Sequence, residues 1–297
     1  MSMEFLKKTN WAHVIIYFIL FLISLSVLIP ILNLLAMSFS DPLKVHELKG
    51  LGIFPKGFSL INYEVLFSNP LIVRSMFNSI LLTVAGTALN LFLTAMSAYV
   101  LARTHFAGKR LIIIFLIVVM VFEPGLIPEY LLVKDLGLLD TYLSLILYKA
   151  INVFYLFILM RFFEDVPDSI IEAARLDGAG HFKIFTKIML PLSKPGLATL
   201  GLFYGVYHWN EYFRATIYLT DPNKWPLQVV LRQFVVERDN TSLLGAQNVL
   251  SYDQIASLDF ASLQAGTIII SIVLLLIFYP LILKYYAKGA LEGGVKD

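Results

Sequence analysis

The chain has 297 residues, of which 58% are apolar and only 15% are charged, whereas soluble domains carry about a quarter charged residues. Lipid is the solvent that suits such a composition, so it predicts an integral membrane protein and excludes an ordinary soluble domain. The formal net charge of +2 gives no reason to expect nucleic acid as a partner, and the absence of cysteine excludes disulfide frameworks and thiolate metal sites.

Six stretches are long and apolar enough to cross a bilayer, which takes about 20 residues in a helix. They are residues 13–36, 76–101, 111–133, 143–163, 196–219 and 264–286. Each is expected to be a helix, because a helix satisfies its own backbone polar groups in lipid. The predicted fold class is therefore all-α: a polytopic membrane protein with about six transmembrane helices in a single domain, residues 1–297.

Basic residues gather on one side of the predicted spans. They are Lys7 and Lys8 before the first span, Arg103, Lys109 and Arg110 after the second, Arg161, Arg175, Lys183, Lys187 and Lys194 after the fourth, and Lys284, Lys288 and Lys296 after the sixth. Such residues remain on the cytoplasmic side, so both termini and the 166–195 loop are predicted to be cytoplasmic and residues 220–263 extracytoplasmic. The first span is too long for a signal-peptide core and is expected to be an uncleaved anchor.

The 166–195 loop is a polar insert in an apolar chain. Ser169 and Glu172 have the spacing of a capping box, which predicts the start of a short helix. This helix should run to Asp177 and end where Gly178 adopts a left-handed conformation.

A second helix is expected to begin at about Gly180. It would place Phe182, Phe185 and Met189 on one stripe, and Pro191 and Pro195 should end it before the fifth span.

Helix physics leaves two interpretations of the insert open. The first is a plain connector at the membrane surface, in which Glu172 only caps a helix. The second is a docking element, because Ala173, Ala174, Gly178 and Ala179 carry almost no side chain and another protein could approach the backbone closely.

The spacing Glu-Ala-Ala, three residues, Gly, nine residues, Ile-x-Leu-Pro occurs here without departure. It resembles the signature of permease subunits of binding-protein-dependent ATP-binding-cassette (ABC) importers. The resemblance implies a type I importer permease fold, and it implies that this loop is a coupling helix seated in a cleft on a cytoplasmic ATPase. The implied coupling residues are Glu172, Ala173, Ala174, Asp177, Gly178, Ala179, Ile188, Leu190 and Pro191.

Other stretches resemble narrower groups of these permeases. Residues 137–147, 191–203, 208–213 and 284–297 are similar to the carbohydrate-uptake branch, of the second-permease, maltose-permease-like type. Residues 77–91 and 225–234 are similar to its polysaccharide and oligosaccharide subgroup, which includes alginate-oligosaccharide importers.

The resemblance also implies partners. They are a second homologous permease chain, two copies of a cytoplasmic ABC ATPase, and an extracytoplasmic solute-binding protein, assembled in a bacterial plasma membrane. No phosphate-binding loop G-x-x-x-x-G-K-[ST] occurs in the sequence. This chain is therefore expected to bind no cofactor, with ATP and Mg²⁺ held by the ATPase.

The fifth span carries the polar residues that suit a sugar pathway. A helix would place Tyr207, Glu211, Arg214 and Tyr218 on one face. A charge at the bilayer centre costs about 2.5–3.5 kcal/mol and usually faces a cavity or a partner. Alternatively, the aromatic residues form a belt near the outer interface and Glu211 pairs with Arg214 within the helix.

The third span is expected to be broken at Pro124, Gly125 and Pro128. Such breaks in membranes tend to line cavities, but a simple kink fits equally well, and Glu123 and Lys149 would face a cavity or each other. The full candidate pathway set is Glu123, Lys149, Asn152, Tyr207, Trp209, Asn210, Glu211 and Arg214.

The functional prediction is a non-catalytic permease subunit that moves oligosaccharides by alternating access. Lys149 and Arg214 favour a cargo with carboxylates, such as alginate or pectin fragments, and a neutral oligosaccharide is the competing choice. The alternative is an ion-coupled secondary transporter, which would need a relay of intramembrane acids and usually an internal repeat. An intramembrane enzyme is disfavoured, because H-E-x-x-H and G-x-S-x-G are absent and the five histidines lack metal-binding spacing.

Overall fold

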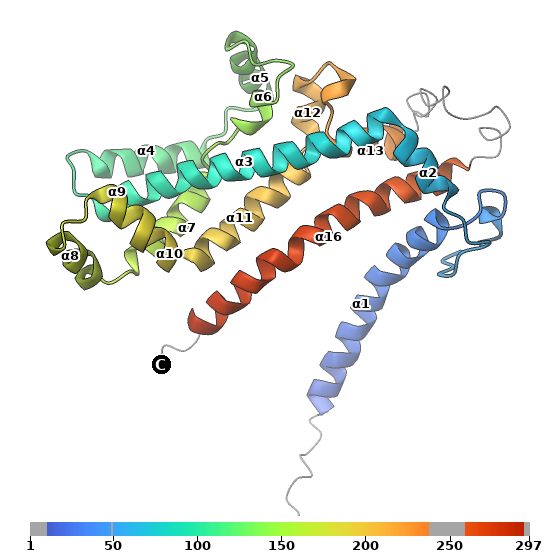
Figure 1. Ribbon diagram of the computed structural model, residues 1–297, viewed down its shortest axis with the longest axis horizontal. Coiled ribbons are helices and arrows are strands. Elements are labelled where there is room, and N and C mark those ends of the chain that lie inside the picture. Colours follow the sequence, from blue (N-terminus) through green and yellow to red (C-terminus); the bar gives the residue numbers. More distant parts are fainter. Residues whose placement is uncertain (1–10, 49, 238–258, 294–297) are drawn as a thin grey trace, which may run out of the picture. The chain divides into compact units, whose positions relative to one another are not determined.

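A computed structural model describes residues 11–48, 50–237 and 259–293, and in these residues the regular structure is helical apart from one bridge between Ser40 and Phe58 (Figure 1). The predicted basic residues Lys7, Lys8 and Lys296, and residues 238–258 of the predicted outer segment, lie outside the described residues. The chain divides into two compact units. One comprises Met1–Pro70 with Glu237–Ile272, and the other comprises Leu71–Val236 with Val273–Asp297.

The first unit contains α1 (Trp11–Ser38), the 3-10 turn η1 (Val45–Glu47), α2 (Ile61–Ser68) and the beginning of α16 (Phe260–Gly293). The most apolar stretch of α1 has no residue buried within the chain, as suits a helix that meets lipid. The Asn62 amide donates to the carbonyls of Ser38 and Ser40 at 3.0 and 3.1 Å, which ties α2 to the end of α1.

The second unit holds the rest of α16, from Val273, and the remaining elements, except that Glu237 at the end of η4 belongs to the first unit. They are α3 (Pro70–Arg103, whose first residue belongs to the other unit), α4 (Lys109–Val121), α5 (Leu126–Asp135), α6 (Leu143–Ile146), α7 (Val153–Glu164), α8 (Asp168–Leu176), α9 (His181–Ile184), the π-helical turn η2 (Phe185–Met189), α10 (Leu190–Leu192), α11 (Lys194–Trp209), α12 (Phe213–Tyr218), η3 (Pro222–Lys224), α13 (Leu227–Arg232) and η4 (Gln233–Glu237).

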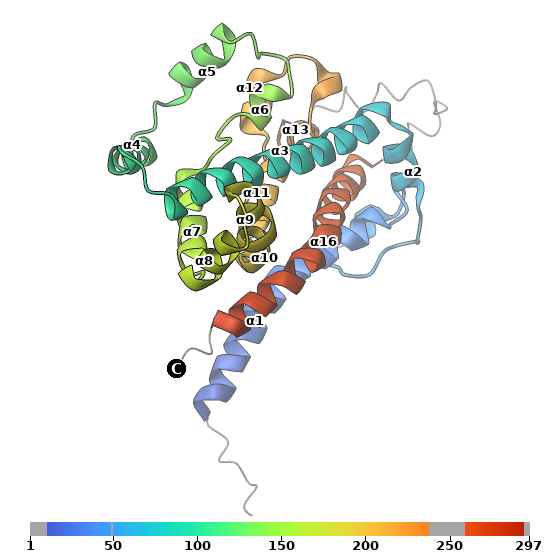
Figure 2. The same ribbon diagram turned by 60° about the vertical axis from the view of Figure 1, so that its left-hand side comes forward.

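Two hydrophobic clusters lie along α3. One surrounds its C-terminal half, where Tyr99 packs with Phe163 of α7, Met189 of η2 and Leu200 of α11. The other surrounds Leu82 and includes buried residues of α5, α6, α12 and α13. Both views show α9 beside the C-terminal end of α3, with α7 close by (Figures 1 and 2). The long helix α3 therefore contributes to both cores of this unit.

Three of the six predicted spans are single helices long and apolar enough to cross a membrane: α1, α3 and α16. The pair α4 and α5 bends by 115° and makes at most one broken span, which gives three or up to four spans in the described residues. The fourth and fifth stretches are also interrupted, because α6 is separated from α7 and α11 from α12. The expectation of one continuous helix is wrong for the fourth and fifth stretches, whereas the third is broken as expected. The count of six spans stays a prediction.

Local chemistry explains the interruptions. The predicted break in the third span is present, with Gly125 at φ +85° between the two helices. In the fourth, Lys149 has φ +50°, and the Asn152 side chain caps α7 by accepting from the amides of Phe154 and Tyr155 at 3.0 and 3.3 Å. An asparagine side chain favours this N-cap over a helix interior, and a search for apolar runs does not register it.

The helices α3 and α11 approach each other closely at Gly86. A Cβ atom there would lie 2.4 Å from Nε2 of His208. That nitrogen lies 3.0 Å from Oδ1 of Asn90, and because an amide oxygen only accepts, Nε2 carries the proton. One turn further along both helices, the hydroxyls of Thr94 and Tyr204 are 2.8 Å apart. Glycine at position 86 thus leaves room for a buried, hydrogen-bonded imidazole.

Replacing Gly86 by alanine should force the His208 ring away from Asn90 and lower stability by about 1–3 kcal/mol, the usual cost of overpacking. The matched control is Gly201→Ala on α11, whose Cβ would meet Leu91 at an acceptable 3.4 Å. Thermal unfolding of the purified protein in detergent measures both. Equal unfolding temperatures for Gly86→Ala and the wild type would contradict this account of the packing.

Candidate functional site

The first helix of the polar insert, α8, begins at Asp168 and not after a capping box. Pro167 is the N-cap and no side chain caps the end, so the predicted Ser169–Glu172 capping box is wrong. The fixed φ of proline suits a helix entry, and Asp168 places its carboxylate in the first turn, where the helix dipole favours a negative charge.

The end of α8 follows the prediction. Gly178 has φ +76°, its amide donates to the Arg175 carbonyl at 3.0 Å, and the Ala179 amide donates to the Ala174 carbonyl at 2.9 Å. This pair of bonds is a Schellman motif, which satisfies carbonyls that the helix would otherwise leave free. The insert therefore turns tightly at Gly178 and has a defined shape.

The second helix of the insert differs from the prediction in two ways. It begins at His181 as α9, but Phe182 is 79% exposed, whereas Phe185 and Met189 are buried. The predicted stripe therefore holds for only two of its three residues, because Phe185 and Met189 pack in the cluster around Tyr99 and Phe182 does not. Pro191 also does not end the helix: it lies within the short α10, at an early position where proline is tolerated.

The nine predicted coupling residues divide by exposure. Ala174, Ala179, Ile188 and Leu190 are half-buried against the cluster around Tyr99, whereas the exposed ones are Glu172, Ala173, Asp177, Gly178 and Pro191. The insert thus has an anchored face and an open face.

Two large apolar side chains, Leu176 at 89% exposed and Phe182 at 79%, flank the open face. Neither residue was predicted from the sequence to take part in docking. The sequence did carry a signal for Leu176, which is a large apolar residue among the small and polar residues of the insert.

Arg214 lies in a partly buried ionic cluster. Its guanidinium nitrogens are 3.6 Å from carboxylate oxygens of both Glu129 and Glu211. The guanidinium carbon lies 3.7 Å from the centre of the Tyr148 ring, and the Tyr148 hydroxyl donates to Glu129 at 3.1 Å. Arg214, Glu129 and Glu211 are between 10% and 21% exposed. We call these four residues the Arg214 cluster.

Only half of the Arg214 cluster was predicted from the sequence. Glu211 and Arg214 were among the candidates, whereas Glu129 and Tyr148 were not, because they come from the segments of the third and fourth predicted spans. The signal for Glu129 was a carboxylate inside an otherwise apolar stretch.

Lys149 and Glu123 face each other, one of the two alternatives that the sequence left open. The Lys149 ammonium donates to Glu123 at 2.8 Å, with the two side chains 39% and 67% exposed. Both cations of the candidate pathway are therefore bound to carboxylates of this chain.

The other pathway candidates occupy separate places. Asn152 caps α7, and the side-chain amide of Asn210 donates to the Val206 carbonyl at 2.8 Å. The single helix that was expected to carry Tyr207, Glu211, Arg214 and Tyr218 is interrupted, because it stops at Trp209 and restarts at Phe213. The four residues are nevertheless near one another, since Tyr207 and the fully buried Tyr218 each interact electrostatically with Glu211 and Arg214.

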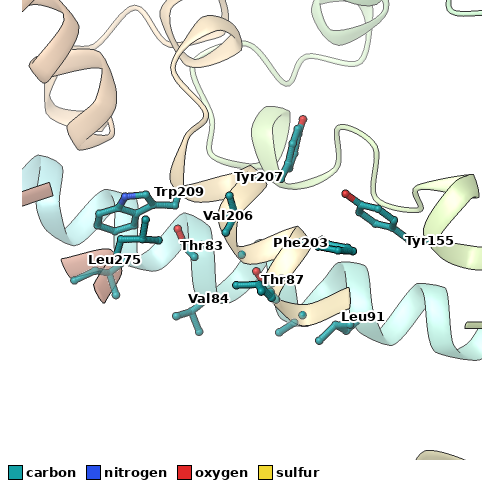
Figure 3. Close-up of a pocket in the computed structure, with 15 residues that line it drawn as sticks. Thr83, Val84, Thr87, Leu91, Tyr155, Phe203, Val206, Tyr207, Trp209 and Leu275 are labelled. Atoms are coloured by element: carbon teal, nitrogen blue, oxygen red, sulfur yellow. The ribbon is translucent and has the colours of Figure 1, made fainter. Parts of the chain in front are cut away.

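Tyr207 and Trp209 line a pocket of about 880 Å³ formed by α3, α7, α11 and α16 (Figure 3). The lining is almost entirely apolar apart from the hydroxyls of Thr83, Thr87 and the tyrosines. The pocket thus offers aromatic rings and few polar groups.

The fold and the site together define a class. The chain is helical, has apolar stretches that are broken, carries ion pairs between the segments of the predicted spans, and has one exposed, small-residue connecting helix, as a transport subunit would have. Residues 87–288 match the family described as "Binding-protein-dependent transport system inner membrane component". The match covers more than half of the chain, and the chain belongs to that family.

Known proteins similar to the chain include two from Bacillus subtilis (strain 168). Protein LplC is 43% identical over 271 residues, which cover 91% of this chain and 89% of that protein. The polygalacturonan/rhamnogalacturonan transport system permease protein YtcP is 40% identical over 290 residues, which cover 97% of this chain and 99% of that protein.

A solved structure is also similar. It is the crystal structure of a bacterial ABC transporter involved in the import of the acidic polysaccharide alginate. One of its chains matches this one with a TM-score of 0.83 and 29% identity, covering 96% of this chain and 100% of that chain. The predicted all-α fold of an ABC importer permease is confirmed, as is the resemblance to sugar permeases.

A polar network holds the start of the predicted outer segment. Oδ1 of Asp140 accepts from the amides of Thr220 and Asp221, both at 3.0 Å, and Lys224 donates to Oδ2 at 2.6 Å. The hydrogen bond from Lys224, followed by that from the Asp221 amide, lowers the pKa of Asp140 from 3.8 to about 2.

Because the folded pKa of Asp140 is depressed, its stabilisation should be complete above about pH 4 and should disappear as the pH falls through about 2. Hydrogen exchange of the Thr220 and Asp221 amides, corrected for the intrinsic pH dependence, should show lost protection in that range. Asp140→Asn should be less protected at neutral pH and show no such step. A wild-type profile that is flat from about pH 5 to about pH 2 would contradict the assignment.

Proposed function

We propose that this chain is one half of the membrane pathway of an ATP-driven importer that takes oligosaccharides from a binding protein and moves them inward by alternating access. The observation that carries the proposal is the exposed α8, which begins the Glu-Ala-Ala…Gly…Ile-x-Leu-Pro spacing on a rigid frame. The family description, which names binding-protein-dependent transport, supports the binding protein as a partner.

The open face of the insert is proposed to dock in a cleft on a cytoplasmic ATPase that holds ATP and Mg²⁺. Leu176 and Phe182 present large apolar surfaces that a partner would cover, and full burial of such a side chain is worth about 1.5–3 kcal/mol. Between them, Ala173 and Gly178 let the partner approach the backbone. The anchored face thus fixes the insert to the rest of this chain, and the open face is exposed for binding by the ATPase.

The topology and the remaining partners belong to the same proposal. Both termini and residues 166–195 are placed in the cytoplasm and residues 220–263 outside, facing the binding protein, on the distribution of basic residues. A second homologous permease would complete the pathway, and two ATPase copies would bind one to each permease. The exposed apolar surface of α4, which has no residue buried within the chain, is available to lipid or to that second permease.

For the cargo, we propose an oligosaccharide, including uronate-containing ones such as pectin or alginate fragments. The support comes from the relatives, since YtcP is named for polygalacturonan and rhamnogalacturonan, and the similar solved structure for alginate. Lys149 and Arg214 give less support to a charged cargo, because both are paired within the chain. Aromatic side chains, such as those of Tyr207 and Trp209, are the better candidates for contact with sugar rings.

Replacing Gly178 by valine should loosen or uncouple the ATPase, because a β-branched residue at φ +76° is strongly disfavoured. The matched control is Gly180→Val: a Cβ atom added at either glycine would meet open space, but Gly180 has φ −74°. The measurement is ATPase stimulation by cargo-loaded binding protein in the purified complex. Wild-type stimulation in Gly178→Val would count against the coupling role.

Replacing Trp209 by phenylalanine should change which saccharides stimulate the ATPase of the intact complex, because the ring lines the pocket while the smaller aromatic keeps the packing. Pectin-derived, alginate-derived and neutral oligosaccharides are compared for their stimulation. An unchanged ranking would remove Trp209 from the pathway. Uptake that persists when the partner ATPase cannot hydrolyse ATP would instead favour the secondary transporter.

A further inference from the structure

Arg103, the last residue of α3, connects three helices with one side chain. Its Nε donates to the Phe163 carbonyl at 2.8 Å, and Nη2 donates to the carbonyls of Phe163, Glu164 and Val166. Its Nη1 pairs with Asp168 at 2.6 Å. The Arg103 side chain is only 10% exposed, although that of Asp168 is 80% exposed.

These partners are the end of α7 and the start of α8. Carbonyls at a helix C-terminus lack intrahelical donors and carry partial negative charge, which a cation satisfies. A guanidinium offers five donors in a rigid fork, whereas a lysine offers one point charge. Arg103 therefore fixes the beginning of the polar insert to the end of α3.

Tyr99 lies one turn earlier on the same face of α3 and contacts the second half of the insert. Its hydroxyl is 3.2 Å from Nδ1 of His181, and its ring centre is 5.3 Å from that of Phe185. The last turn of α3 thus holds both helical halves of the insert, through Arg103 and through Tyr99.

The other end of α3 is bound to the Asn223–Leu227 segment. The Asn78 amide donates to the carbonyls of Asn223 and Trp225 at 2.9 and 3.0 Å, and Ser79 accepts from the Leu227 amide at 2.7 Å. From Asn78 to Arg103 the helix is continuous and about 37 Å long at 1.5 Å per residue.

We propose that α3 is a rigid strut between the insert and the Asn223–Leu227 segment, and that Arg103 is the positioning residue that transmits movement of the insert to it. The inference rests on the proposed function, in which an ATPase moves the insert. In the second unit, the fourth and fifth predicted spans and the α4–α5 pair are interrupted. Such breaks can absorb a displacement, whereas a continuous helix clamped at both ends passes it on.

The test uses the intact complex, in which single cysteines can be placed freely because this chain has none of its own. Spin labels go on Ile170 of α8, which is exposed and is not part of the proposed docking face, and on Val73 near the start of α3, which is also exposed. Their separation is compared in the nucleotide-free and nucleotide-trapped states. In the wild type it should stay constant, because insert and strut move together. In Arg103→Gln it should change or broaden when nucleotide binds.

Two controls accompany Arg103→Gln. Arg161→Gln removes another arginine ion pair at the same helix end, Arg161 to Glu164 at 2.9 Å, that does not involve α3, and it should behave as the wild type. Asp168→Asn breaks the ion pair but keeps the carbonyl contacts, so it should fold even if Arg103→Gln does not, and it should show a smaller broadening in the same direction.

A purely structural role would lower thermal stability and ATPase co-purification without separating the labels. A transmitting role should leave the ATPase bound and cut its stimulation by loaded binding protein by about fivefold or more, the lower range of coupling between two sites. Constant label separation in both Arg103→Gln and Asp168→Asn would overturn the strut. A Leu176→Cys that never cross-links to the ATPase, even in the wild type, would overturn the proposed function itself.

Discussion

The constraint on which the rest of the second unit depends is that backbone polar groups away from water must find partners within the protein. Where apolar stretches are interrupted, polar side chains supply missing bonds. Three of these side chains lie on α3: Asn78 donates to the carbonyls of Asn223 and Trp225, Asn90 to that of Lys149, and Arg103 to those at the end of α7. One unbroken helix therefore makes the breaks in its neighbours tolerable.

Pairing of charge within the chain limits what the candidate pathway can do. Two carboxylates and one guanidinium meet in the Arg214 cluster, and Lys149 is bound to Glu123. Removing one partner of such a partly buried group leaves an uncompensated charge, which costs more than the pair contributes. These side chains therefore hold the segments around the broken spans in place, whether or not cargo touches them. On the proposed function, contact with sugar rings falls to the aromatic lining of the pocket.

Much of the architecture could be predicted from sequence, because it depends on local chemistry. The all-α fold follows from apolar length, the break at Gly125 from two prolines, and the turn at Gly178 from the ease with which glycine adopts positive φ.

What could not be predicted depends on residues that are distant in sequence. Nothing local marks Arg103 as the partner of Asp168, or Glu129 and Tyr148 as neighbours of Arg214. The end of α11 at Trp209 was not predicted either, because the span was predicted from apolar length alone and that criterion does not respond to the single polar residue Asn210. The Ser169–Glu172 capping box failed because the helix begins at Asp168, directly after a proline.

The division of the insert into an anchored and an open face has a genetic consequence. On the proposed function, an unfavourable exchange at Glu172 or Ala173 damages a contact with another polypeptide, so a second change in the gene for the ATPase can restore it. An exchange at Ala174 or Ala179 disturbs packing within this chain, and its suppressors must lie in the same gene. On the proposed function, Ala173 is thus constrained by the ATPase, whereas its neighbour Ala174 is constrained by packing within this chain.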